Sequence, residues 1–298
     1  MTDVAQTLAP AAPPRAALPR PSAGAWCAVP IGLLLMGGFV APLLLVVVFS
    51  FMPRGTFSPF GAPTLGNYVD IVQQNFHISF LWSLWLALLT TLILLTVCYP
   101  LATAIKRASP RRALLLTVLI VAPLFVAENI RLHGWVLFLD RAGVLDGGLR
   151  ALTGAGPGSL VGTVPAIVFG MVYVYLPFML FPMILGLSNV PADSLEAARD
   201  LGANRWQVFR DIELPLAMPG ILIGALLCFV ISLGAFSESK FLGKGVIVTI
   251  SQDIESAFTF GQNWPRGSAL SVLVILLAGA AVFLALRRID LDAMLGKR

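Results

Sequence analysis

Charged residues are scarce in this sequence, since Asp, Glu, Lys and Arg together make up 12% of its 298 residues. A soluble globular domain carries about 25%. The hydrophobic fraction is 58% and the mean hydropathy is +0.88. Several apolar runs exceed the roughly 20 residues that a membrane-crossing helix needs. The composition therefore excludes an ordinary soluble domain and predicts an integral membrane protein.

Cysteine and histidine are also few. The three cysteines lie inside apolar runs without a CxxC spacing, and we interpret them as small packing residues: Cys27, Cys98 and Cys228. His77 and His133 have no potential ligands in register, so no metal site is predicted. The net charge of +5 is spread over loops without a basic stripe, which does not indicate a nucleic-acid partner.

A phosphate-binding loop of the form GxxxxGK[ST] is missing as well. Gly243-Lys244 is followed by Gly245, and Glu238 occupies the position of the first glycine. An intramembrane enzyme would need paired catalytic groups. The spans offer only Glu128 and His133 near each other, with no nucleophile at a useful spacing. We therefore expect no catalysis and no cofactor in this chain.

Six apolar segments are long enough for a helix to cross the hydrocarbon core of a bilayer. We expect spans at about 26–51, 78–105, 113–139, 161–188, 214–236 and 267–286. Only the third span is interrupted by charge. The first is longer than the roughly 7–15 residues of a signal-peptide core, so we expect it to be retained.

The distribution of Lys and Arg favours cytoplasmic N- and C-termini. In that orientation thirteen of these residues lie on inner segments and six on outer segments. The predicted organisation has four parts. They are a disordered, Ala- and Pro-rich cytoplasmic tail at 1–25, a first transmembrane helix with an outer loop at 26–77, a core of five spans at 78–288 and a cytoplasmic tail at 289–298.

One polar segment, at 191–213, interrupts the apolar core on its cytoplasmic side. Its residues predict two short helices around a turn, because Leu195–Arg199 are good helix formers and Gly202 can adopt the left-handed conformation that ends a helix. Asn204 can cap the second helix. We expect Leu214-Pro215 to stop this pattern and to open the fifth span.

An ordinary helix lying on the lipid headgroups would explain Trp206 and the arginines of this segment. It does not explain why Ala197-Ala198 is followed by Gly202, which gives the segment a face of small residues. Such a face allows the surface of another protein to approach closely.

The spacing of this segment resembles a known motif. Glu196-Ala197-Ala198-x3-Gly202-x9-Ile212-x-Leu214-Pro215 is similar in all seven positions to the EAA motif of the inner-membrane permeases of ABC importers. The resemblance implies an all-α integral membrane fold with six transmembrane helices, of the type I ABC importer permease kind. It also implies that 191–213 forms coupling helices that insert into a cleft on a cytoplasmic ATPase.

The same resemblance implies roles and partners. Glu196, Ala197, Ala198 and Gly202 would dock on the ATPase, and Ile212, Leu214 and Pro215 would join the docking helix to the fifth span. The implied partners are a second permease subunit, in a heterodimer, two ATP-binding subunits that hold ATP and Mg²⁺, and a periplasmic substrate-binding protein.

Further stretches resemble the spermidine/putrescine branch of this family. These are Asn129–Trp135, Gly143-Val144-Leu145, Leu233–Phe236 with Leu242-Gly243, and Asn263-Trp264-Pro265. The likeness implies polyamine transport, or transport of a related amine. An opine, a phosphonate or a ferric ion carried by the same machinery remains the alternative. Glu128 and Glu238 stand where the branch usually has uncharged residues.

Charges within the third span and after the fifth mark a candidate translocation path or gate at Glu128, Arg131 and Glu238. A charge near the bilayer centre costs about 2.5–3.5 kcal/mol on insertion scales, so such residues usually face a bundle interior. Glu128 and Arg131 are three residues apart and could simply pair with each other. Alternatively, the carboxylate meets a cationic substrate, or the charges form a gate.

Overall fold

The structure is a computed structural model that describes residues 23–287. Every regular element in this range is helical. The chain divides between Leu45 and Val46 into two compact units, which are described separately. The predicted tails lie outside the described residues, except for 23–25, which begin the first helix.

The first unit holds α1 (Ala23–Leu35), the π-helical turn η1 (Met36–Val40) and the start of α2 (Ala41–Ser50). Pro42 has no N–H to donate to the carbonyl group four residues earlier, which explains the wider turn just before it. Nearly all apolar side chains from Val29 onward in this unit are exposed. A helix that is apolar on every side suits a lipid environment, and Val29–Ser50 is long enough to span it.

The second unit contains the remaining elements. They are α3 (Gly66–Gln73), α4 (Phe76–Arg107), α5 (Pro110–Val121), the 3₁₀ turn η2 (Ala122–Phe125), α6 (Glu128–Leu139), α7 (Val144–Thr153), α8 (Val164–Ser188), α9 (Ala192–Asp200), α10 (Arg205–Gln207), the π-helical turn η3 (Val208–Glu213), α11 (Leu214–Leu233), α12 (Ser237–Gly243), α13 (Ile250–Thr259) and α14 (Trp264–Leu286).

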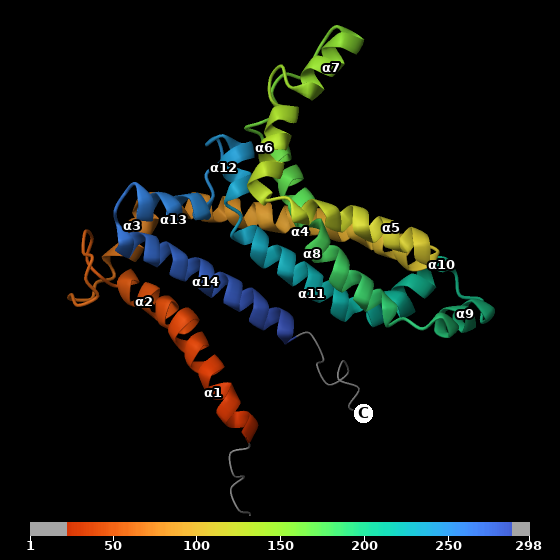
Figure 1. Cartoon of the computed structure of the whole chain (residues 1–298), viewed down its shortest axis with the longest axis horizontal. Coiled ribbons are helices and arrows are strands. Elements are labelled where there is room, and N and C mark those ends of the chain that lie inside the picture. The colour runs from red at the N-terminus through yellow and green to blue at the C-terminus, as the bar shows by residue number, and fades with distance from the viewer. Residues whose placement is uncertain (1–22, 288–298) are drawn as a thin grey trace, which may run out of the picture. The chain divides into compact units, whose positions relative to one another are not determined.

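Three long helices, α4, α8 and α11, pack against one another and form the centre of this unit (Figure 1). Their shared core includes Leu94, Met179 and Met183, which are fully buried. Cys98 and Cys228 are buried here too, with Sγ–O distances of 3.8 Å to the Leu176 carbonyl and 3.6 Å to the Tyr175 carbonyl. The predicted packing role of these two cysteines is confirmed, and the side chain of Cys27 lies outside the described residues.

Glycine allows α8 and α11 to cross closely. A Cβ added to Gly186 would lie 2.7 Å from the Ala217 carbonyl oxygen and 2.9 Å from the Gly220 Cα. A Cβ on Gly220 would overlap the Pro182 carbonyl oxygen. Small residues at a crossing are the usual way in which membrane helices gain packing contact, because lipid provides no hydrophobic driving force between them.

Five described helices are long and apolar enough to cross a membrane, and six spans result if one bent pair counts as a single span. The predicted third span at 113–139 is wrong as a straight helix. Segments Pro110–Phe125 and Glu128–Thr153 meet at an angle of 97°. Pro123 cannot continue the hydrogen-bond ladder, and Val126 and Ala127 are extended, so the helix restarts at Glu128 in a new direction.

Candidate functional site: a coupling segment and a buried charge cluster

The polar segment 191–213, called the coupling segment below after its expected role, begins with α9, which has no buried residue. Its end is closed by backbone bonds, in which the Gly202 N–H donates to the Arg199 carbonyl at 2.9 Å and the Ala203 N–H donates to the Ala198 carbonyl at 3.0 Å. Gly202 has a φ of +86°, and a Cβ there would meet nothing within 4 Å. The glycine is therefore required by the left-handed backbone, as predicted, and not by packing within the chain.

The second helix of the segment begins at the predicted cap. Asn204 Oδ1 accepts from the Gln207 N–H at 2.9 Å, and the Asn204 N–H donates to Gln207 Oε1 at 2.8 Å. This reciprocal pair is a capping box, which satisfies two backbone donors that the helix start leaves free. The two bonds fix the direction in which the chain turns after α9.

Helix α11 begins at Leu214, as expected, but the expected stop before it is wrong, because helix continues from Arg205 to Leu233 without a break. Pro215 lacks the N–H that would bond to the Asp211 carbonyl. The chain accommodates this loss with the π-helical turn η3 and not by ending the helix. The second half of the segment is thus continuous with the membrane-spanning α11.

The residues assigned to docking lie together on this segment. Glu196, Ala197 and Gly202 are exposed, and Ala198 is half-buried. Ile212 and Leu214 are half-buried where η3 joins α11, and Pro215 is exposed there. The segment therefore offers an open surface at its tip and partly packed residues at its base.

The three candidate path residues also come together, although they belong to α6 and α12. Glu238 is 1% exposed and its Oε1 has no hydrogen-bond partner among the described residues. Glu128 and Arg131 are charges that act on its carboxyl group, and the Tyr175 phenol lies beside it. The Arg131 guanidinium lies 5.5 Å from the ring centroid of Tyr173, and its Nε is likewise buried without a partner in the described chain.

This arrangement differs from a simple ion pair. Within residues 23–287 no ion pair joins Glu128 to Arg131, so the interpretation as a self-satisfied pair is not supported. His133, on the same helix, contacts the ring of Phe241 at 4.4 Å between centroids, and its Nδ1 lies 2.7 Å from the Asn129 carbonyl oxygen. Within this cluster, Glu238 Oε1 and Arg131 Nε are buried with unused hydrogen-bonding capacity among the described residues.

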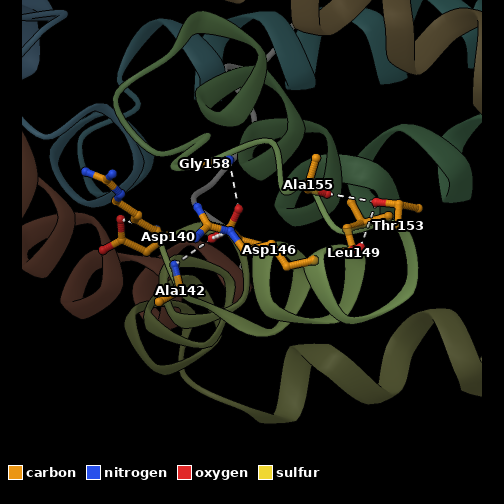
Figure 2. A network of polar contacts seen from close by, with 9 residues as sticks. Asp140, Ala142, Asp146, Leu149, Thr153, Ala155 and Gly158 are labelled. Atoms are coloured by element: carbon orange, nitrogen blue, oxygen red, sulfur yellow. Dashed lines mark hydrogen bonds and ion pairs between the residues drawn. The ribbon is translucent and has the colours of Figure 1, made fainter.

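A polar network that the sequence did not reveal organises the loop after α6. Figure 2 shows Asp146, 1% exposed, at its centre. Its carboxylate accepts from the Gly158 N–H at 2.8 Å, the Ala142 N–H at 3.0 Å and Arg150 Nε at 3.0 Å. The hydrogen bond from the Gly158 N–H lowers the pKa of Asp146, and Ala142 and Arg150 act in the same direction. Desolvation of the carboxylate acts in the opposite direction and is the weaker influence. Isolated loop carboxylates of this kind carry no motif, so nothing in the spacing identified it.

Asp140 connects this loop to α12. Its carboxylate bonds to Lys244 Nζ, Ser159 Oγ and the Arg141 N–H, each at 2.8 Å. These bonds, led by that from Lys244, lower the pKa of Asp140 to about 2. The Gly162 N–H also donates to the Leu242 carbonyl at 2.6 Å. The end of α12 is therefore held against the loop that joins α6 to α8.

Comparisons with known proteins agree with this architecture. Residues 113–290 match the family described as "Binding-protein-dependent transport system inner membrane component". The chain is 34% identical over 249 residues to the spermidine/putrescine transport system permease protein PotB of Haemophilus influenzae, covering 83% of this chain and 87% of that protein. It is 33% identical over 251 residues to PotB of Escherichia coli K12, covering 84% and 91%.

A solved bacterial ABC transporter involved in the import of the acidic polysaccharide alginate has a similar fold. The TM-score is 0.73 at 17% identity, over 89% of this chain and 95% of that one. At this identity the likeness speaks for the fold alone. From the family match and the identity to the PotB proteins, the chain belongs to the inner-membrane permeases of binding-protein-dependent ABC importers, in the spermidine/putrescine branch, and is a multi-pass transport subunit and not an enzyme.

Proposed function

We propose that this chain forms half of the translocation pathway of an ATP-driven importer. It pairs with a second, different permease chain, two ATP-binding subunits and a periplasmic binding protein. The observation that carries the proposal is the coupling segment, whose exposed tip at α9 is preorganised by Gly202 and Asn204 and whose far end continues into α11. A force applied to the tip acts directly on a membrane-spanning helix.

The energy for transport comes from the partner that binds ATP and Mg²⁺. Closure of the two ATPase subunits displaces the coupling segments and moves α8 and α11 between inward-open and outward-open arrangements. Nucleotide shifts this equilibrium only as far as it binds the two arrangements with different affinity. The chain's own residues contribute the docking surface, the connection to α11 and the lining of the path.

The cargo is a small organic amine, and a polyamine is our specific proposal. Relatives that the chain covers almost fully are named for spermidine and putrescine. The cluster of Glu128, Arg131 and Glu238 supports this, because it places two carboxyl groups near the rings of Tyr173 and Tyr175. An ammonium group is attracted both to a carboxylate and to an aromatic face.

Two substitutions test the docking role. Glu196→Lys reverses the charge at the exposed tip, and Gly202→Asp adds a side chain where the backbone is left-handed. Both should abolish uptake of labelled putrescine in cells that carry the complete importer, while the chain still inserts into the membrane. Normal uptake in either variant contradicts the docking role.

Gly154→Asp is the matched control for the glycine. Gly154 ends α7 with a φ of +78° and also has open space where a Cβ would stand. The backbone strain is therefore comparable, but the position is remote from the coupling segment. Uptake should survive in Gly154→Asp, and equal loss in both glycine variants would attribute the defect to strain.

Calorimetry on the binding protein of the same importer tests the cargo. Tight binding of putrescine or spermidine supports the polyamine assignment. Binding of an opine, a phosphonate or ferric ion, with no binding of either polyamine, contradicts it while leaving the docking role intact.

A further inference from the structure

The inner end of α4 contacts the coupling segment at the point where the chain enters it. Lys106 Nζ donates to the Leu187 carbonyl at 2.6 Å and to the Val190 carbonyl at 3.1 Å. The Leu187 carbonyl belongs to the last turn of α8, where it also accepts from the Val190 N–H at 3.2 Å, and Lys106 supplies a further, charged donor. A positive group at this end also interacts favourably with the helix dipole. Lys106 therefore fixes the end of α8 and the start of the segment to α4.

The same end of α4 contacts the segment where the chain leaves it. The Tyr99 ring packs edge-on against Phe209 of η3, with 5.3 Å between the centroids. Glu213, also in η3 and 8% exposed, is the acidic group that acts on the Tyr99 hydroxyl. That hydroxyl is buried and makes no hydrogen bond within the described part of the chain.

Two of the three central helices are covalently joined to the coupling segment, since α8 precedes it and α11 follows it. The third, α4, is separated from it in sequence and reaches it through Lys106 and Tyr99. A displacement of the segment therefore moves α8 and α11 through the backbone. The helix α4 can follow through its packing against α8 and α11 and, directly, through Lys106 and Tyr99.

The Tyr99 contact has room for a second arrangement. A buried hydroxyl without a partner is unfavourable. A small shift of η3 along α4 that joins it to the Glu213 carboxylate would satisfy it. The contact lies at a π-helical turn, where helices readily change register.

We propose that Lys106 and Tyr99 are positioning residues that attach α4 to the coupling segment, and that a Tyr99–Glu213 hydrogen bond forms when the segment moves. The attachment makes α4 follow the segment during the transport cycle. This inference rests on the proposed docking of the segment on an ATPase.

Hydrogen exchange of the purified complex of permeases and ATPase, with and without ATP, tests the attachment without knowledge of the cargo. In the wild type, ATP should change protection both in the segment 191–213 and at the inner end of α4, residues 99–107. In Lys106→Met and Tyr99→Phe the segment should still respond, whereas the response of 99–107 should be weaker than in the wild type. Lys106→Arg should restore it.

Two variants serve as controls. Arg111→Met removes an exposed positive charge near the start of α5, and Tyr68→Phe removes a tyrosine hydroxyl that bonds to Ser50 Oγ at 2.9 Å, far from the segment in sequence. Both should respond to ATP as the wild type does. If residues 99–107 respond equally in Lys106→Met, Tyr99→Phe and the wild type, the attachment is wrong.

The outcome separates this inference from the proposed function. Absence of any ATP response at 191–213 in the wild type would overturn the docking of the segment, and the attachment with it. A response at 191–213 with unchanged behaviour of α4 in the variants would overturn the attachment alone. In transport assays the double variant Tyr99→Phe/Glu213→Gln should be no worse than either single variant, and additive defects would overturn the hydrogen bond.

Discussion

Glu238 is an ionisable side chain in a place where the fold gives it almost no water and leaves Oε1 without a hydrogen bond. Such burial is costly for a charged group that lacks part of its hydrogen bonding. A residue whose burial costs the fold stability is a candidate for a functional role. For Glu238 we expect this role to be the attraction of a cationic cargo.

Glu238→Gln keeps the volume of the side chain and removes its charge. We expect the purified variant to be no less stable than the wild type, because a neutral amide costs less to bury than a charged carboxylate, and we expect the putrescine concentration needed for half-maximal uptake to rise. Thermal unfolding in detergent and uptake assays measure the two effects. Glu255→Gln, which removes the more exposed carboxylate paired with Lys240 at 2.8 Å, is the control and should leave uptake unchanged. Unchanged uptake in Glu238→Gln contradicts a role in the path.

Asp140 predicts a pH dependence of the loop after α6. The bonds from Lys244, Ser159 and Arg141 lower the pKa of Asp140 to about 2, whereas the pKa of Asp in an unfolded chain is about 3.9. The stability that ionised Asp140 gives to the folded loop is therefore complete above about pH 4 and is lost as the pH falls through about 2. Cleavage of the loop 140–162 by pepsin, which is active in acid, should increase over this window.

Asp140→Asn is the matching variant. It cannot ionise, so its loop should already be more susceptible to pepsin at pH 4 and should show a weaker increase below it. The remaining increase belongs to Asp146, whose pKa is lowered in the same direction. Identical cleavage profiles for the variant and the wild type would contradict the role given to the Lys244 contact.

At the scale of helices, the crossing of α8 and α11 depends on Gly186 and Gly220. Gly220→Ala should force the two helices apart, because its Cβ would overlap the Pro182 carbonyl oxygen. We expect a loss of about 1–3 kcal/mol from overpacking, measured as a lower unfolding temperature in detergent. Gly279→Ala in α14, where a Cβ meets nothing within 4 Å, is the control and should not destabilise the chain. Equal stability of the two variants would show that the crossing tolerates a side chain.

The sequence predicts where helices form, but it does not predict where a helix bends or continues past a proline. Apolar length located five spans closely, and Gly202 and Asn204 identified the turn and the cap of the coupling segment, because those residue types have strong local preferences. The bend at Pro123 and the passage through Pro215 were misjudged. Each proline removes one backbone N–H from the helix. The helix breaks after Pro123 but only forms a wider turn before Pro215, and the packing around each proline decides between these two outcomes.

At the scale of the whole molecule, much of the described surface is apolar. On α5 the exposed side chains include Leu114, Leu115, Val118 and Leu119. Lipid covers such surface without cost, and so does a second permease chain. The exposed tip of the coupling segment is different, because it is polar and because the helix Arg205–Leu233 follows it directly in the chain.

The site was predictable only where chemistry is encoded in fixed spacing. The EAA motif identified Glu196 to Pro215 from seven positions, and charge in apolar surroundings identified Glu128, Arg131 and Glu238. Asp140, Asp146, Tyr99 and the two bonds of Lys106 were missed. Their partners are backbone groups or residues far away in sequence, which only the folded chain brings together.

The most direct test of the central claim is a cross-linking measurement in the assembled importer. A cysteine introduced at Ala197, on the exposed tip of α9, should form a thiol cross-link to the ATPase, and the yield should change when ATP is added. Docking of the coupling segment on the ATPase is contradicted if Ala197→Cys never cross-links to the ATPase and is labelled only by lipid-phase reagents or only from the outer side of the membrane.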